Sequence, residues 1–156
     1  GLQAYIKPIF IDADMNIIAE RVGEAHAKEC YNWKAMEDLG IRVSGGSDCP
    51  VELPDVMKGI QCAVTRTTVK DHVGPYLPEQ ALDIKQALDS FTAEGAYASF
   101  EENVKGRIAP GMLADFVILG ANPFETSPEE LAGIPVEATY VDGVCRYSIE
   151  TEGKQK

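Results

Sequence analysis

Short apolar runs and stretches with helical spacing alternate along the first part of the chain. Residues 5–11 form an apolar, β-branched run that predicts a buried strand, although Pro8 within it cannot donate a hydrogen bond to a sheet. Helical spacing follows over residues 16–22 and 27–39, and residues 41–46 then predict a second strand that ends in glycines. A strand, helix, strand order with this spacing predicts a βαβ unit and therefore a parallel sheet.

The clearest helix signal begins at Asp83. Asp83 and Gln86 have the N-cap and N3 spacing of a capping box. Apolar side chains then recur at positions i, i+3, i+4 and i+7, namely Ile84, Ala87, Leu88 and Phe91. Further helices are predicted over residues 55–64 and 92–100. Gly40 follows the earlier helical stretch at the position where the end of a helix favours glycine.

The pattern changes to short strands and turns after about residue 103. Residues 114–119 predict a strand, because they are apolar and β-branched. Residues 136–141 and 144–147 flank Asp142-Gly143, a dipeptide that favours the two-residue turn of a β-hairpin. We therefore expect a small β part at the C-terminal end of the chain.

These elements divide the chain into three parts. The first is an α/β part over residues 1–103, the second a β part over residues 104–149, and the last a polar tail over residues 150–156. The predicted fold class is α/β with a parallel sheet. Four large aromatic side chains are expected in the core, namely Trp33, Phe91, Phe100 and Phe116.

Composition and charge narrow the classes of function. The 156 residues are 45% hydrophobic and 25% charged, as is typical of globular chains. The formal net charge of −11 argues against nucleic acid and anionic membranes as partners, because both bind basic patches. We find no apolar run of about 18 residues and no basic-then-apolar leader. The four cysteines form no CxxC pair, which favours free thiols in a reducing cytoplasm over disulfides.

The strongest candidate site is the segment over residues 44–51, with the sequence SGGSDCPV. It places Asp48 directly after the carboxyl end of a predicted parallel strand, where the loops of α/β folds line a crevice. A carboxylate at this place can bind a metal ion and accept a proton from a metal-bound water. On these grounds alone a structural role is equally open, with Asp48 capping the loop or the next helix.

Other candidate groups have weaker support. The glycines of this segment lack the spacing of a phosphate-binding loop. His26 and His72 are the only histidines, and neither has a second ligand at metal-binding spacing, so surface positions are expected for both. Nothing in the sequence supports a nucleophilic pair of Cys49 with a histidine. Arg66 ends a predicted helix and binds either an anionic group of a substrate or, as the simpler alternative, one of the many carboxylates of the chain.

A series of motifs resembles, in order, those of the amidohydrolase superfamily. Residues 46–51, GSDCPV, resemble the GSDxPV signature of amidohydrolase family 3, the YtcJ-like or exoenzyme regulatory protein-like group. Residues 59–66 resemble that group's helix ending in AVxR, and residues 87–98 resemble its next helix pair. Residues 106–119 resemble the GxLxPGxxADxVxL strand of the superfamily, and residues 139–144 resemble its closing hairpin. The resemblance covers nearly the whole chain and identifies it as a C-terminal fragment.

The resemblance implies the last part of a (β/α)8 metallo-dependent hydrolase barrel and the C-terminal strands of a composite β-sandwich. Asp48 would then follow the eighth barrel strand, ligate the metal and handle the proton during hydrolysis. Residues 5–11 would be the seventh strand, although many members have Gln-Pro where this chain has Lys7-Pro8. The other metal ligands, several histidines and a bridging lysine or glutamate, would lie upstream of Gly1.

The parent protein would be a metal-dependent hydrolase that cleaves amide or other C–N bonds of a small molecule, with zinc as the expected divalent metal. Since one carboxylate cannot hold such an ion, the fragment alone is expected to bind no metal tightly and to be inactive. The alternative is a non-catalytic interaction domain that retains the end of this fold. The sheet edges of a truncated barrel also predict a homo-oligomer.

Overall fold

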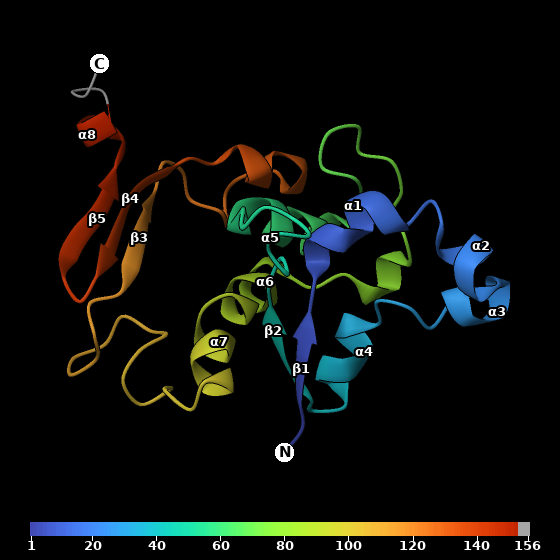
Figure 1. The fold of residues 1–156 in the computed structure, drawn as a ribbon, viewed down its shortest axis with the longest axis horizontal. Helices are drawn as coiled ribbons and strands as arrows, with labels where there is room; N and C mark the ends of the chain where they lie inside the picture. The colour runs from blue at the N-terminus through green and yellow to red at the C-terminus, as the bar shows by residue number, and fades with distance from the viewer. Residues whose placement is uncertain (153–156) are drawn as a thin grey trace.

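Two separate sheets organise the protein, whose computed structural model describes residues 1–152 (Figure 1). In the first sheet, β1 (Gln3–Ile6) and β2 (Arg42–Gly45) run parallel, with short helices packed around them. The second sheet lies at the left of Figure 1 and is antiparallel. It consists of β3 (Phe116–Leu119), β4 (Val136–Val141) and β5 (Val144–Ser148).

The parallel pair confirms the predicted βαβ unit, with Ile6 aligned to Gly45. The Gly46 amide donates to the Ile6 carbonyl at 3.0 Å, which extends the pairing by one residue beyond β2. The predicted strand over residues 5–11 is too long, because the 3-10 helix η1 (Pro8–Phe10) follows Ile6 after a single residue. Proline has no amide hydrogen for a sheet but fits the first turn of a helix, so the strand ends before it.

The segment between the two strands is made of short helices. They are α1 (Ile11–Asp14), α2 (Ile18–Val22), α3 (Glu24–Ala27) and α4 (Trp33–Asp38). The single helix predicted over residues 27–39 is therefore wrong. Tyr31 interrupts it with a φ of 59°. Its hydroxyl donates to Asp14 and its carbonyl accepts from Arg66, so contacts distant in sequence stabilise the break.

The end of α4 confirms the role predicted for Gly40. The φ of Gly40 is 74°, its amide donates to the Glu37 carbonyl at 2.8 Å, and the Ile41 amide donates to the Met36 carbonyl at 2.9 Å. This pair of bonds is the Schellman arrangement, which satisfies the last carbonyls of a helix and turns the chain back. It directs the chain into β2.

Three further helices pack near the parallel pair. They are α5 (Val56–Thr65), α6 (Ile84–Ser90) and α7 (Ala93–Ala98). Asp55 caps α5 by accepting from the Lys58 amide at 3.2 Å. The predicted capping box is present at α6, where the Asp83 carboxylate accepts from the Gln86 amide at 2.8 Å and the Gln86 side chain accepts from the Asp83 amide at 2.9 Å. Side chains from β1, β2, α4 and α5 form most of the core, among them Ile6, Trp33, Val43, Met57 and Ile60.

The amino end of β2 is held by an ion pair with α7. Nε of Arg42 donates to Glu94 at 2.6 Å and Nη2 donates to the same carboxylate at 2.9 Å. The Arg42 guanidinium also lies 3.7 Å from the centre of the Tyr97 ring. A bidentate pair stacked on an aromatic ring fixes the helix against this end of the strand.

The predicted aromatic core is correct in part. Trp33 is 2% exposed, and Phe91 is half-buried against the core. Phe116 is half-buried and stacks on Tyr140, with ring centres 4.6 Å apart. Phe100 is 92% exposed, so its predicted core position is wrong. It follows α7 with a φ of 61°, and this left-handed turn directs its side chain away from the helix packing.

The second sheet agrees with the predicted strands. β4 and β5 are joined by Asp142 and Gly143, whose φ values of 51° and 72° are those of the predicted two-residue hairpin turn. The predicted tail begins within a short helix, α8 (Ile149–Glu152), and the rest of it, residues 153–156, lies outside the described residues. The predicted boundary near residue 103 falls in the segment between α7 and β3. Helices η2 (Pro78–Gln80) and η3 (Pro128–Gly133) complete the described elements.

Both sheets present unpaired edges. Within residues 1–152, β1 and β2 pair only with each other, and β3 and β5 are the outer strands of the second sheet. Large apolar side chains are exposed on these strands, with Tyr5 64% and Val144 50% exposed. No helix in the described part of the chain is long and apolar enough to cross a membrane.

We expect the chain to form a homodimer or a higher oligomer, because open strand edges pair with other chains. Light scattering over a dilution series measures the mass. Val144→Lys places a charge on the β5 edge and should shift association to at least about 10-fold higher concentration. Val73→Lys, at an equally exposed position of a loop, is the control. A monomer at all concentrations, with one cooperative melting transition, would contradict the expectation.

Candidate functional site

Asp48 lies in the loop that leaves the carboxyl end of β2, as the sequence predicts. Its side chain is exposed and its φ is 58°, a left-handed conformation that aspartate adopts more readily than most residues. The Asp48 carbonyl accepts from the Val51 amide at 2.9 Å and closes a tight turn. The structural alternative had the Asp48 carboxylate capping the loop or helix α5. The side chain that caps α5 belongs to Asp55 instead, which leaves the Asp48 carboxylate open to solvent.

The glycines before Asp48 allow a close approach of the Phe91 ring. A Cβ atom on Gly45 would lie 2.8 Å from this ring, and a Cβ atom on Gly59 of α5 would lie equally close. Real Cβ atoms do not tolerate such distances, so both positions need glycine for steric reasons. The ring therefore packs between the end of β2 and the side of α5, under the loop that carries Asp48.

A small hollow of about 260 Å³ opens beside this loop. Its walls come from the end of β2, the amino end of α5, η1 and α6, and they are mostly apolar. The lining residues are Ile9, Gly45, Gly46, Ser47, Pro54, Asp55, Val56, Gly59 and Phe91. The hollow has room for a small apolar group of a ligand beside Gly46 and Ser47 of the Asp48 loop, but few polar groups to orient it.

The described residues do not form a complete metal site. No group of three histidine, cysteine, aspartate or glutamate side chains with metal-binding geometry occurs within residues 1–150. His26 and His72 are exposed, as expected, and neither is brought into such a group with Asp48. Since zinc needs about three or four ligands, Asp48 and the other described side chains do not form a zinc site by themselves.

The structure places Arg66 in the core, at the opposite end of α5 from the hollow. Its side chain is 0% exposed. Nε donates to the Tyr76 carbonyl at 2.7 Å, Nη1 donates to the Tyr31 carbonyl at 2.9 Å, and the guanidinium lies 4.5 Å from the centre of the Trp33 ring. Burial lowers the pKa of Arg66 to about 10.

These contacts bear on both predictions for Arg66. Two backbone carbonyls and the Trp33 ring stabilise the charged guanidinium. No carboxylate of the described residues forms an ion pair with it. Its Nη2 atom is buried without a hydrogen-bond partner in the same part of the chain. The salt-bridge interpretation is therefore wrong for the described residues. The substrate-binding role stays a prediction, and the structure does not bring Arg66 to the Asp48 loop.

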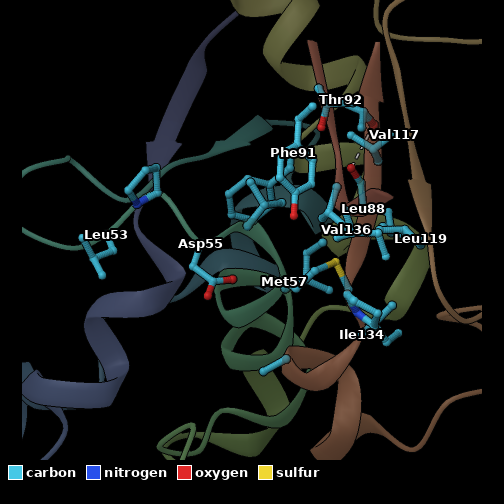
Figure 2. Close-up of a pocket in the computed structure, with 18 residues that line it drawn as sticks. Leu53, Asp55, Met57, Leu88, Phe91, Thr92, Val117, Leu119, Ile134 and Val136 are labelled. Carbon is cyan, nitrogen blue, oxygen red and sulfur yellow. Dashed lines mark hydrogen bonds between the residues drawn. The ribbon is translucent and has the colours of Figure 1, made fainter. Parts of the chain in front are cut away.

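A larger apolar cavity, of about 870 Å³, lies between the helices and the second sheet (Figure 2). Figure 2 shows Met57, Leu88 and Phe91 from the helical side opposite Val117 and Val136 of the sheet. Sequence reasoning missed this cavity, because its walls come from several separate segments between residues 53 and 149 and each segment has only an ordinary apolar pattern. Few polar groups of this cavity converge on one point, so its walls suit apolar packing rather than catalysis.

The chain has clear relatives. The amidohydrolase family profile matches residues 1–147. The putative amidohydrolase YtcJ of Bacillus subtilis (strain 168) is 32% identical over 143 residues, covering 91% of this chain and 27% of the relative. The N-substituted formamide deformylase of Arthrobacter pascens is 34% identical over 114 residues, covering 73% of this chain and 21% of the relative. The chain spans about a quarter of the length of these curated relatives.

A solved structure shares the fold. An uncharacterized metal-dependent hydrolase from Pyrococcus horikoshii OT3 matches with a TM-score of 0.69 and 33% identity, over 80% of this chain and 25% of that protein. The match confirms the predicted fold class, in which the chain has the mixed α/β arrangement of part of a metal-dependent hydrolase.

Replacing Arg66 with lysine should lower the free energy of unfolding by about 2–4 kcal/mol, because lysine cannot span two carbonyls while stacking on Trp33. Denaturant unfolding at neutral pH measures the change. Arg107→Lys, on an exposed loop, should change stability by less than about 0.5 kcal/mol. Unchanged stability of Arg66→Lys would contradict a structural role and would favour the substrate-binding prediction.

The purified chain should bind Zn²⁺ no more tightly than surface carboxylates do, because Asp48 belongs to no group of three metal-binding side chains within the described residues. Calorimetric titration of the chain and of Asp48→Ala should give the same weak binding. A stoichiometric, sub-micromolar site that disappears in Asp48→Ala would show that the chain holds a complete metal centre.

Proposed function

Because the chain belongs to the amidohydrolase family, we propose that it is the C-terminal portion of a metal-dependent hydrolase that cleaves amide or other non-peptide C–N bonds. The observation that carries this proposal is the position of Asp48. Its free carboxylate lies at the carboxyl end of a parallel strand pair, the end at which α/β barrels place catalytic groups.

The C–N bond specificity is supported by the family and by the name of one relative. The Arthrobacter relative is named as a deformylase of N-substituted formamides, which are compounds with a C–N amide bond. A small hollow beside Asp48 suits a small-molecule substrate rather than a long polymer. We therefore propose a small amide, or a related compound, as the substrate.

Asp48 has two roles in this proposal. Its carboxylate supplies one ligand to a divalent metal, most simply zinc, and accepts a proton during hydrolysis. When such a metal is bound, it polarises the scissile carbonyl and makes a bound water acidic near neutral pH. The exposed position of Asp48 leaves its carboxylate oxygens available for both roles.

The remaining ligands and barrel strands are proposed to belong to the rest of a longer polypeptide. The match covers 27% of one relative and 21% of another, and two parallel strands do not close a (β/α)8 barrel. We propose that the isolated chain is inactive, because one carboxylate does not hold a metal ion.

The cytoplasm is the compartment that we propose for the protein, because all four cysteines are free. Burial raises the pKa of the Cys62 thiol to about 12, so that thiol is unreactive at neutral pH. The other three thiols are partly or fully exposed, and a reducing compartment would keep them unpaired.

Asp48→Asn in the full-length protein should lower kcat for amide hydrolysis by about 100-fold or more, because asparagine cannot accept the proton. The fold should survive, since the residue lies in an exposed loop that asparagine also fits. Steady-state kinetics with matched metal content measure the effect.

Asp71→Asn is the matched control, because it removes the same charge from another exposed loop. Its activity should stay within about 2-fold of the unmodified protein, as is usual for a surface change that touches no site. Full activity of Asp48→Asn would contradict the proposed role of Asp48 and would favour a non-catalytic interaction domain.

A further inference from the structure

Residues 68–75 form a loop that leaves the end of α5 and returns to its own starting point, as the green loop beside α1 in Figure 1. At its base, the Tyr76 amide donates to the Arg66 carbonyl at 2.8 Å and Nε of Arg66 donates to the Tyr76 carbonyl at 2.7 Å. Inside the loop, Thr68 and Val73 share two hydrogen bonds, each 3.0 Å long. We call residues 68–75 the strap, because both of its ends are fixed at one place.

The strap is joined to other elements at a single residue. Among the hydrogen bonds of the described residues, those that connect the strap to another helix or strand both lie at Val69. Its amide donates to Oδ1 of Asp12 in α1 at 2.6 Å, and its carbonyl accepts from Nε2 of Gln61 in α5 at 3.3 Å. The strap can therefore leave its position by breaking these two bonds, while the hydrogen bonds at its base remain.

The two partners of Val69 differ in how firmly they are placed. Gln61 is 1% exposed, and its Oε1 also accepts from the Ala132 amide of η3 at 2.9 Å, so this side chain is fixed. Asp12 is exposed at the surface, where water can replace the Val69 amide as its partner. The bond to Asp12 is nevertheless the stronger one, because it is short and its acceptor is charged. The position of the strap thus depends mainly on an exposed carboxylate.

Two hollows border the strap, and they share the lining residues Lys58, Val69 and Lys70. The smaller hollow, of about 230 Å³, is also lined by Glu52, which belongs to the segment between Asp48 and α5. The larger hollow, of about 660 Å³, reaches η3. Because the strap supplies two of the three shared residues, its outward movement would join the hollows into one groove along α5. That groove would open beside the Asp48 loop.

We propose that the strap is a lid over this groove and that the Asp12 carboxylate is its latch. Asp12 lies in α1, which follows the carboxyl end of β1, so the latch and the Asp48 loop belong to the same end of the parallel pair. Loops at such a position open to admit or release small molecules and close to exclude water. This control of access rests on the proposed hydrolase function, whereas the movement of the strap and the role of Asp12 as its latch do not.

The test measures access to the smaller hollow in the full-length protein. Glu52→Cys places a thiol in the wall of that hollow, and peptide mass spectrometry follows its alkylation by iodoacetamide. Adding Asp12→Ala should raise the alkylation rate about 10-fold, because the lost hydrogen bond to a charged acceptor favours the open strap. Adding Asp12→Asn should raise it less than about 3-fold, because the amide oxygen still accepts from Val69.

Hydrogen exchange gives a second measurement that needs no introduced thiol. In Asp12→Ala the amides of the strap should exchange about 10-fold faster, while those of β2 and α7 keep their rates, since only a local opening is favoured. Glu20→Ala is the matched control, because it removes a carboxylate from an exposed position of α2. It should change neither measurement. The exposed thiol of Cys49, which does not line the hollow, should be alkylated at the same rate in every variant.

Three results would overturn the proposal. The first is an alkylation rate and a strap exchange rate that do not rise in Asp12→Ala. The second is an equal rise of exchange throughout the protein, which would mean a general loss of stability. The third is an Asp12→Asn variant that opens the strap as far as Asp12→Ala does.

The outcome is separable from that of the proposed function, because both measurements are made without substrate. A strap that opens in Asp12→Ala, in a protein that hydrolyses no amide, would refute the hydrolase and retain the latch. Amide hydrolysis by a protein whose strap does not respond to Asp12→Ala would refute the latch and leave the hydrolase in place.

Discussion

The contact of the Phe91 ring with two glycines positions the elements around the Asp48 loop. Phe91 follows α6, Gly45 ends β2 and Gly59 lies within α5, so one ring joins a strand and two helices. A glycine inside a helix costs about 1 kcal/mol relative to alanine. Here the cost is offset by an approach that no larger residue permits. The amino end of α5 and the end of β2 consequently border one hollow, and Asp48 leaves the strand beside it.

Arg66 provides a second constraint, which orders two irregular segments, one before β2 and one after α5. Its two hydrogen bonds go to the carbonyls of Tyr31 and Tyr76, which lie 35 and 10 residues away in sequence. Neither carbonyl belongs to a helix or strand, so the guanidinium satisfies backbone groups that would otherwise be buried without partners. A charged side chain thus stabilises loops that lack the backbone hydrogen bonds of a helix or a strand.

Sequence reasoning recovers the elements whose signals are local. The capping box at Asp83, the terminal Gly40 and the turn at Asp142-Gly143 each occur as predicted, because the residues that determine them are neighbours. Asp48 also lies where predicted, since its place depends on one strand and the loop that follows. The helix predicted over residues 16–22 is present as α2, but the break at Tyr31 was not foreseen, because it is stabilised by Asp14 and Arg66.

The same distinction explains the errors at the site and in the core. The burial of Arg66 depends on Trp33 and two distant carbonyls, none of which its own segment reveals. The exposure of Phe100 follows from one left-handed turn that its apolar character does not indicate.

The two ends of strand β2 differ in how they are held. At its amino end, Arg42 is held by Glu94 and the ring of Tyr97, and these contacts tie the strand to α7. At its carboxyl end, the chain enters a loop of mostly small residues, in which the side chain of Asp48 is exposed. In the proposed hydrolase, substitutions in that loop would therefore change which molecules are bound while the contacts of Arg42 still hold the strand. The arrangement allows new specificities to evolve on an unchanged support.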